Sequence, residues 1–183
     1  MLEIEMKFPA PDFAPIQEKL LRWNPRRDEA REEADHYYNA PDRDFARTDE
    51  ALRLRRSGAA NVVTYKGPRQ AGPAKTRTEI EVALENGAQA AEDFCRLLTH
   101  LGYRAVAVVS KKRLVYHFDS GGFALQACLD DVDRLGHFVE VEIVAPEDRK
   151  TQAQQVLLQV VGELGLTDVE RRSYLEMILQ ILP

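Results

Sequence analysis

Cysteine is scarce in this 183-residue sequence: Cys95 and Cys128 lie far apart and form no paired motif. Such spacing is typical of reduced, buried thiols in a cytoplasmic protein, and it disfavours a disulfide framework or a zinc site. The four histidines also lack the spacing of a zinc cluster. No glycine-rich phosphate loop is present, so we expect neither a P-loop nor a dinucleotide-binding fold.

Long apolar runs are absent as well. Glu3, Glu5 and Lys7 interrupt the N-terminus early, so no signal peptide is expected, and no run is long enough to cross a bilayer. The net charge of −5 gives no overall attraction to nucleic acid or acidic membranes. With 44% apolar and 30% charged residues, the chain is typical of one globular, cytoplasmic domain over residues 1–183, without nucleic-acid or membrane partners.

What the sequence does contain is alternation of charged and apolar residues. In the first strand Glu3, Glu5 and Lys7 share one face, and apolar side chains share the other. Residues 24–34 are polar and are expected to lead into a strand that ends before Pro41. Alternation predicts further strands over residues 51–57, 61–67, 76–84, 103–118, 123–133 and 137–145. Helical spacing predicts helices over residues 13–23, 90–101, 153–164 and 173–182.

Each predicted strand sets a charged face against an apolar face, and the amphipathic helices need an apolar surface to cover. The economical arrangement is a curved antiparallel sheet with helices on its apolar outside and charges lining its inside. Such an interior must be wet and must pair its charges, because unpaired buried charge is very costly. The alternative is a flat sheet whose charged face is simply solvated.

The predicted interior carries acids and bases together. Its acids are Glu3, Glu5, Glu79, Glu81, Asp130, Glu140 and Glu142. Its bases are Lys7, Arg53, Arg55, Lys66, Arg77, Lys111 and Arg113. Carboxylates suit a hard divalent cation, and Arg and Lys suit phosphate oxygens. A ligand that needs both groups is a metal-chelated polyphosphate.

In these residues the sequence resembles the CYTH superfamily, also called the triphosphate tunnel metalloenzymes. Glu3-Ile4-Glu5-Met6-Lys7 is similar to the family's N-terminal Glu-x-Glu-x-Lys. Segments similar to later family motifs follow in order at residues 35–38, 52–55, 64–68, 77–81, 111–113, 129–130 and 135–142. Ser173-Tyr174-Leu175-Glu176 resembles the subgroup of class IV adenylyl cyclases.

The resemblance implies an α+β fold with a closed or nearly closed antiparallel barrel of about eight strands and helices packed outside. It also implies Mg²⁺ or Mn²⁺, a bound triphosphate and a cytoplasmic homodimer. The metal ligands carried over by position are Glu3, Glu5, Asp130, Glu140 and Glu142. The phosphate-binding residues carried over are Lys7, Arg53, Arg55, Lys66, Arg77, Lys111 and Arg113. Glu79 and Glu81 either hold a second metal or orient the cations.

The function favoured by the resemblance is that of a class IV adenylyl cyclase, in which the ribose 3′-hydroxyl of ATP attacks the α-phosphorus to give cyclic AMP and pyrophosphate. An inorganic tripolyphosphatase or thiamine triphosphatase is the alternative, and a non-catalytic polyphosphate- or nucleotide-binding module is the third hypothesis. Lys7, Lys66 and Tyr37 are the candidate catalytic residues, although Tyr37 suits packing in the barrel wall equally well. Residues 152–155, Arg104 and loop 68–75 are the candidates for contact with the base.

Overall fold

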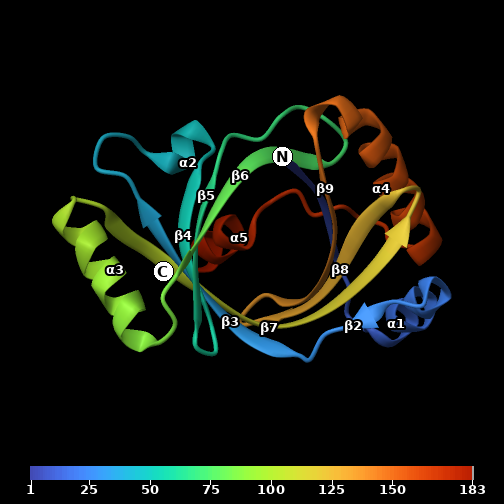
Figure 1. Ribbon diagram of the computed structural model, residues 1–183, viewed down its shortest axis with the longest axis horizontal. Coiled ribbons are helices and arrows are strands. Elements are labelled where there is room, and N and C mark those ends of the chain that lie inside the picture. The colour runs from blue at the N-terminus through green and yellow to red at the C-terminus, as the bar shows by residue number, and fades with distance from the viewer. Residues whose placement is uncertain (183) are drawn as a thin grey trace.

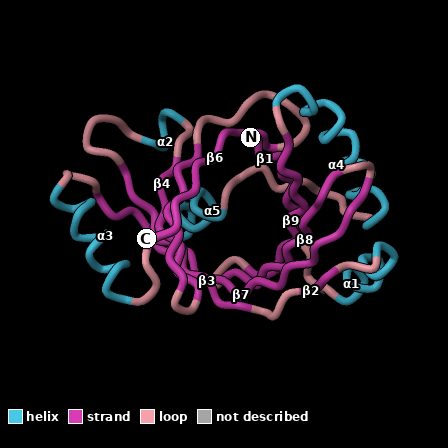
Figure 2. The backbone as a smooth tube through the Cα atoms, viewed as in Figure 1, coloured by secondary structure: helices cyan, strands magenta, loops and turns pink. Residues whose placement is uncertain are grey.

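The strands of the computed structural model, which describes residues 1–182, close into a barrel. Antiparallel neighbours follow the order β7-β3-β4-β5-β6-β1-β9-β8, and β8 pairs with β7 to close the ring (Figure 2). The barrel strands are β1 (Leu2–Pro9), β3 (Arg31–Asn39), β4 (Ala51–Ser57), β5 (Ala60–Lys66), β6 (Lys75–Leu84), β7 (Arg104–Ser120), β8 (Phe123–Val132) and β9 (Gly136–Ala145). The expected barrel of about eight strands is therefore confirmed.

The region before residue 35 contains more strand than its polar sequence suggested. β3 begins at Arg31, and the two-residue β2 (Arg26–Arg27) pairs with the far end of β7. Arg31 and Glu33 lie opposite Arg113 and Lys111 of β7, so their side chains face the barrel interior. Because that interior is charged, the strand carries no apolar stripe by which the sequence could reveal its start.

Helices cover the apolar outer surface of the barrel (Figure 1). The helices are α1 (Ala14–Leu20), α2 (Phe45–Thr48), α3 (Ala88–His100), α4 (Lys150–Leu164) and α5 (Tyr174–Ile181), with short 3-10 turns at Leu21–Trp23 and Glu147–Arg149. Under α1 and α4, Ile4, Phe8 and Leu157 are fully buried in one cluster. Burying each such side chain contributes about 1.5–3 kcal/mol. None of the described helices has the length and apolar character that a membrane crossing requires.

α5 differs from the other helices because it packs against side chains of the inner face. Tyr174 and Ile178 are buried in a cluster with Tyr37, Val109 and Phe138. These residues lie at the end of the barrel where β3 and β8 finish and β9 begins, and Figure 1 shows α5 within the outline of the ring. The helix therefore closes part of one end of the tunnel.

A capping box fixes the start of α5. The backbone N–H of Glu176 donates to Ser173 Oγ over 3.1 Å, and the N–H of Ser173 donates to Glu176 Oε2 over 2.6 Å. These two bonds satisfy backbone donors that the first helical turn would otherwise leave free. The Ser-Tyr-Leu-Glu segment thus sets where Tyr174 enters the barrel.

Candidate functional site

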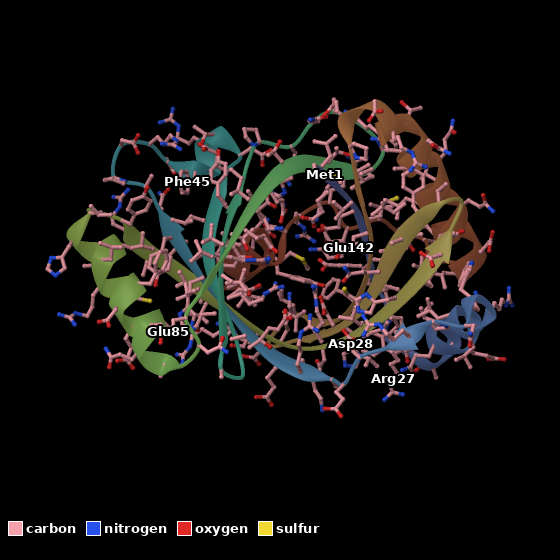
Figure 3. All side chains as sticks on the ribbon, in the orientation of Figure 1. Met1, Arg27, Asp28, Phe45, Glu85 and Glu142 are labelled. Atoms are coloured by element: carbon pink, nitrogen blue, oxygen red, sulfur yellow. The ribbon has the colours of Figure 1, made fainter. Side chains whose placement is uncertain are left out.

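The barrel encloses a cavity of about 610 Å³ with lining residues from all eight strands and from α2 and α5. Every predicted site residue lines this cavity except Asp130, which is fully buried beside it. Period-two alternation produces this result, because each charged face predicted from the sequence turns inward once the sheet closes. Figure 3 shows Glu142 near the centre of the ring. The alternative of a flat sheet with a solvated charged face is therefore wrong.

Three carboxylates converge on one wall of the cavity, and we call Glu3, Glu5 and Glu142 the acid cluster. One oxygen from each residue lies within 4.8 Å of the others. Glu5 and Glu142 are direct neighbours on the paired strands β1 and β9, and Glu3 lies two residues from Glu5 on the same face. A compact group of carboxylate oxygens is the ligand type that Mg²⁺ and Mn²⁺ prefer.

The pKa values of Glu3 and Glu142 show that positive charge is short at these two members of the acid cluster. Burial, together with the charges of Glu5 and Glu140, raises the pKa of Glu142 to about 7. Burial likewise raises the pKa of Glu3 well above its usual range. Burial also acts to raise the pKa of Glu5, but Lys75, 3.0 Å away, and other lysines hold it well below its usual range. A divalent cation would supply the missing charge, so the cluster fits one.

Asp130 and Glu140, the other two predicted metal ligands, bind Arg113 instead. Arg113 Nε donates to Asp130 Oδ1 over 2.7 Å, and the Arg113 guanidinium also binds the Glu140 carboxylate. Tyr174 donates a further hydrogen bond to Asp130 Oδ2 over 2.9 Å. Burial acts to raise the pKa of Asp130, but the Arg113 and Lys111 charges lower it to about 2. Their oxygens are therefore engaged by the protein, and the structure does not bring them into the acid cluster.

The predicted phosphate-binding cations on β4 are paired with an aspartate. Asp35 of β3 accepts from Arg55 Nε over 2.7 Å and from Arg53 Nη1 over 3.3 Å, with 1% of its side chain exposed. Burial would raise the pKa of Asp35, but the arginines hold it far below its usual range. Lys111 is within 3.5 Å of Glu33. These charged groups thus form a buried network of ion pairs.

Lys66 and Arg77 share a carboxylate near the acid cluster. Lys66 Nζ donates to Glu79, and Arg77 Nε lies 3.6 Å from the same carboxylate. Lys66 Nζ is also 3.7 Å from Glu3. Glu81, with 58% of its side chain exposed, accepts from Thr64. The contacts of Glu79 fit the predicted orienting role.

Lys7 differs from the other predicted cations because its ammonium has neither a hydrogen-bond partner nor an ion pair within 4 Å among residues 1–182. The residue is 1% exposed, and Nζ lies 3.9 Å from the centre of the Tyr174 ring. Burial lowers the pKa of Lys7 to about 8. A buried ammonium with free donors and a cation–π contact is available to a ligand oxygen. Tyr37 packs in the cluster under α5, so its contacts favour the packing alternative.

Comparison with known proteins identifies the family of this chain. The family model described as CYTH domain matches residues 1–174. The chain belongs to the CYTH family. A protein of Methanocaldococcus jannaschii named "Putative adenylate cyclase" is 32% identical to it, with 97% of this chain and 98% of the relative covered. The resemblance that the sequence motifs indicated is therefore confirmed.

Solved structures share the tunnel of this CYTH chain. A protein from Pyrococcus horikoshii OT3 has a TM-score of 0.83 and 37% identity over 97% of this chain and 98% of its own. A Hippeastrum protein, described as a "Putative adenylyl cyclase" with a "dominant triphophatase activity", has a TM-score of 0.67 and 17% identity. It covers 100% of this chain and 97% of its own, and at this identity it shows the fold alone.

The CYTH tunnel contains functional candidates that the sequence motifs missed. Lys75 pairs with Glu5 and opens the strand that carries Arg77, so extending the alternation by two residues would have found it. Glu33 was hidden in the polar stretch of residues 24–34, within which β3 begins. Residues 152–155 and Arg104 do not line the cavity, whereas loop 68–75 lines it through Arg69 and Lys75.

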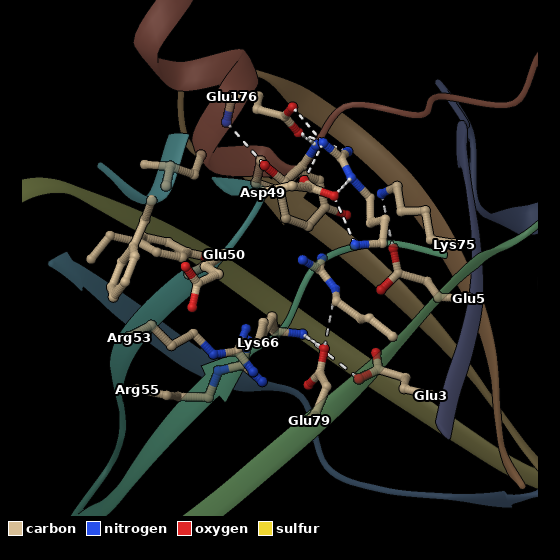
Figure 4. A pocket seen from close by; sticks show the side chains of 18 of the residues that line it. Glu3, Glu5, Asp49, Glu50, Arg53, Arg55, Lys66, Lys75, Glu79 and Glu176 are labelled. Carbon is tan, nitrogen blue, oxygen red and sulfur yellow. Dashed lines mark hydrogen bonds and ion pairs between the residues drawn. The ribbon is translucent and has the colours of Figure 1, made fainter. Parts of the chain in front are cut away.

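One opening of the CYTH tunnel is bordered by a three-residue bridge. Arg69 Nη2 lies 2.6 Å from Asp49, at the end of α2, and 3.1 Å from Glu176 of α5. Figure 4 shows Asp49 and Glu176 together beside α5, with Glu3 and Glu79 on the opposite side of the view. The bridge joins α2, the loop after β5 and α5 across this rim.

Proposed function

We propose that this chain is a metal-dependent enzyme that acts on a triphosphate bound in the tunnel, and that it converts ATP to cyclic AMP and pyrophosphate. One observation carries the proposal. The three carboxylates of the acid cluster converge in a closed, cation-lined cavity that also holds the unpartnered ammonium of Lys7. The adenylate cyclase name of the Methanocaldococcus relative supports cyclisation as the reaction.

In the proposed reaction the tunnel residues would have different roles. Glu3, Glu5 and Glu142 would hold Mg²⁺ or Mn²⁺, which when bound neutralises charge on the triphosphate. Lys7 and Lys66 would donate to phosphate oxygens, where charge develops as pyrophosphate leaves. Glu79 would hold Lys66 and Arg77 in place. The closed wall would align the ribose 3′-hydroxyl with the α-phosphorus by limiting how the nucleotide lies.

In the proposed reaction the 3′-hydroxyl loses its proton to water, and its oxygen forms a bond to the α-phosphorus while the bond from that phosphorus to the bridging oxygen of pyrophosphate breaks. Negative charge moves to the pyrophosphate, so cations around that group lower the barrier more than cations around the sugar. Removing one such donor from an enzyme site typically costs about 10²–10³ in kcat. Lys7 and Lys66 are the cations assigned to this role.

Hydrolysis of a triphosphate is the second candidate function. The charged part of the cavity would contact phosphate oxygens alone and would accept inorganic tripolyphosphate or thiamine triphosphate as well as ATP. A triphosphatase activity is described for the Hippeastrum protein, and hydrolysis is therefore the alternative reaction to test here. A cytoplasmic location and a homodimer stay predictions.

A product assay tests the proposal. The purified protein would be offered ATP, tripolyphosphate and thiamine triphosphate separately, each with Mg²⁺ or Mn²⁺. We expect cyclic AMP and pyrophosphate from ATP. Orthophosphate from tripolyphosphate without cyclic AMP would replace cyclisation by hydrolysis. Tight tripolyphosphate binding without turnover would favour the binding module, and no binding of any triphosphate would overturn the assignment of the tunnel.

A further inference from the structure

α5 has a second apolar stripe that the protein buries only in part. Tyr174 and Ile178 are 6% and 4% exposed and fill the closed end of the barrel. Leu175 and Leu179, each one residue further along, share the next stripe and line the cavity. Leu179 remains 42% exposed, and no described residue covers it fully.

A β-bulge adds another apolar side chain to the same wall. In the pairing of β3 with β7, Tyr37 lies opposite Ala107 and Tyr38 opposite Ala105, so Val106 is the extra residue between them. A bulge changes the direction of the side chain that it carries, and here Val106 lines the cavity while 37% exposed. Phe45 and Ala46 of α2 line the cavity as well.

The chemistry of this wall contrasts with the rest of the cavity. Inorganic tripolyphosphate is charged along its whole length and gains nothing from contact with leucine and valine. A nucleobase has two flat apolar faces, and its transfer from water onto an aliphatic wall is favourable. The cavity volume of about 610 Å³ lies within the 300–1,000 Å³ typical of sites for organic ligands.

We propose that Val106, Leu175 and Leu179 form the subsite for the nucleoside end of a nucleoside triphosphate whose phosphates lie among the tunnel cations. This inference rests on the proposed function, because it requires a triphosphate in the tunnel. The wall is continuous with the charged cavity, so one ligand contacts both. The position also explains how one tunnel prefers a nucleotide to inorganic tripolyphosphate when its charges alone do not distinguish them.

A matched pair of variants tests the subsite. Leu179→Asn places a polar amide in the wall, and Leu158→Asn makes the same change on α4, at a leucine that is also 42% exposed and does not line the cavity. Calorimetry with Mg²⁺ would give the affinity of each variant for α,β-methylene-ATP, which cannot be cyclised, and for inorganic tripolyphosphate. We expect Leu179→Asn to weaken the nucleotide analogue about 5- to 10-fold and to leave tripolyphosphate within about twofold.

The outcomes test the nucleoside subsite separately from triphosphate binding in the tunnel. Unchanged analogue affinity in Leu179→Asn, or equal loss of both ligands, would overturn the nucleoside subsite while the triphosphate tunnel stands. Equal effects of Leu158→Asn and Leu179→Asn would do the same, because a general stability effect would then explain both. Failure of the unchanged protein to bind either ligand would overturn the proposed function itself. A double variant that adds Leu175→Asn is expected to lose the analogue further, again without loss of tripolyphosphate.

Discussion

Two sides of the tunnel interior contain the same residue types in different electrostatic states. On the paired side, formed by Glu33, Asp35, Arg53, Arg55 and Lys111, each carboxylate contacts two or more cations, and both pKa values are lowered. In the acid cluster on the opposite side, the pKa values of Glu3 and Glu142 are raised, and only Glu5, which pairs with Lys75, has a lowered pKa.

The difference shows that charge in a buried interior has two uses. Fully compensated ion pairs connect neighbouring strands and have few free donors or acceptors for a ligand. An uncompensated group, in contrast, is stabilised when a ligand of opposite charge binds. The paired side therefore serves mainly the barrel, and the acid cluster serves mainly the ligand. Substitutions on the two sides should separate stability from activity.

The largest effect is expected from Asp35→Asn on the paired side. The change leaves the buried Arg53 without its nearest carboxylate and leaves Arg55 with Glu33 alone, so the free energy of unfolding should fall by about 3–5 kcal/mol. Urea unfolding followed by circular dichroism measures this loss. Asp93→Asn, which breaks an exposed pair with Arg96, is the control and should cost less than about 1 kcal/mol. A loss below about 1 kcal/mol for Asp35→Asn would contradict the structural role of this side.

Lowering the pH should weaken the ion pairs of the paired side and so reduce the stability of the protein. The folded-state pKa of Asp35 lies below its unfolded value of about 3.9, so its contribution is complete above that value and is lost as the pH falls through the folded pKa. The unfolding free energy should therefore drop between about pH 5 and pH 2. Asp35→Asn should show a shallower drop over this range when both proteins are unfolded by urea at each pH. If the unfolding free energies of the two proteins fell in parallel with pH, Asp35 would not be the cause of the acid sensitivity.

Glu142→Gln should produce the opposite pattern in the acid cluster, because this carboxylate has a raised pKa and no ion-pair partner within 4 Å among the described residues. It removes one carboxylate charge while keeping nearly the same shape, so turnover should fall by at least about 100-fold and the unfolding free energy should change by less than about 1 kcal/mol. Steady-state rates over a Mg²⁺ titration and urea unfolding measure the two quantities. Glu92→Gln, on the exposed surface of α3, is the matched control. Full activity of Glu142→Gln at saturating Mg²⁺ would exclude Glu142 as a metal ligand.

The smallest effect concerns Tyr174, whose ring lies beside Lys7 and whose hydroxyl binds Asp130. Tyr174→Phe keeps the ring 3.9 Å from Lys7 and removes the hydrogen bond to Asp130, whereas Tyr174→Leu removes both. Cation–π contacts are worth about 0.5–2 kcal/mol, so KM for the triphosphate should rise about threefold to tenfold in Tyr174→Leu and less in Tyr174→Phe. Ile178→Val, in the same buried cluster, controls for lost packing. Equal KM values for the Phe and Leu variants would show that the ring does not position Lys7.

Much of the fold was readable from the sequence because strand alternation is a local property. β4 was predicted with its observed bounds, and β8 and β9 to within one residue at each end. The start of β3 was missed since its inward face is charged. The position of α5 was also beyond the sequence, because an amphipathic helix looks the same whether it packs outside a barrel or into its end.

The site was predictable to a similar extent. The predicted site residues other than Asp130 line the cavity, since a two-residue period places them on one face, but the motifs did not include Lys75. They did not distinguish Glu142, which joins the acid cluster, from Glu140, which binds Arg113, because both are glutamates on the same face of β9.

The sequence by itself determined which side chains share a face and therefore which charges enter the tunnel. Only the tertiary structure decided how those charges divide, because pairing depends on strand register across the closed barrel. Asp35 forms ion pairs with two arginines, whereas Glu142 lies beside other carboxylates, and the sequence alone does not distinguish these two environments. The bulge that turns Val106 into the cavity and the helix that places Leu175 and Leu179 in the lining of the same cavity are likewise products of long-range packing.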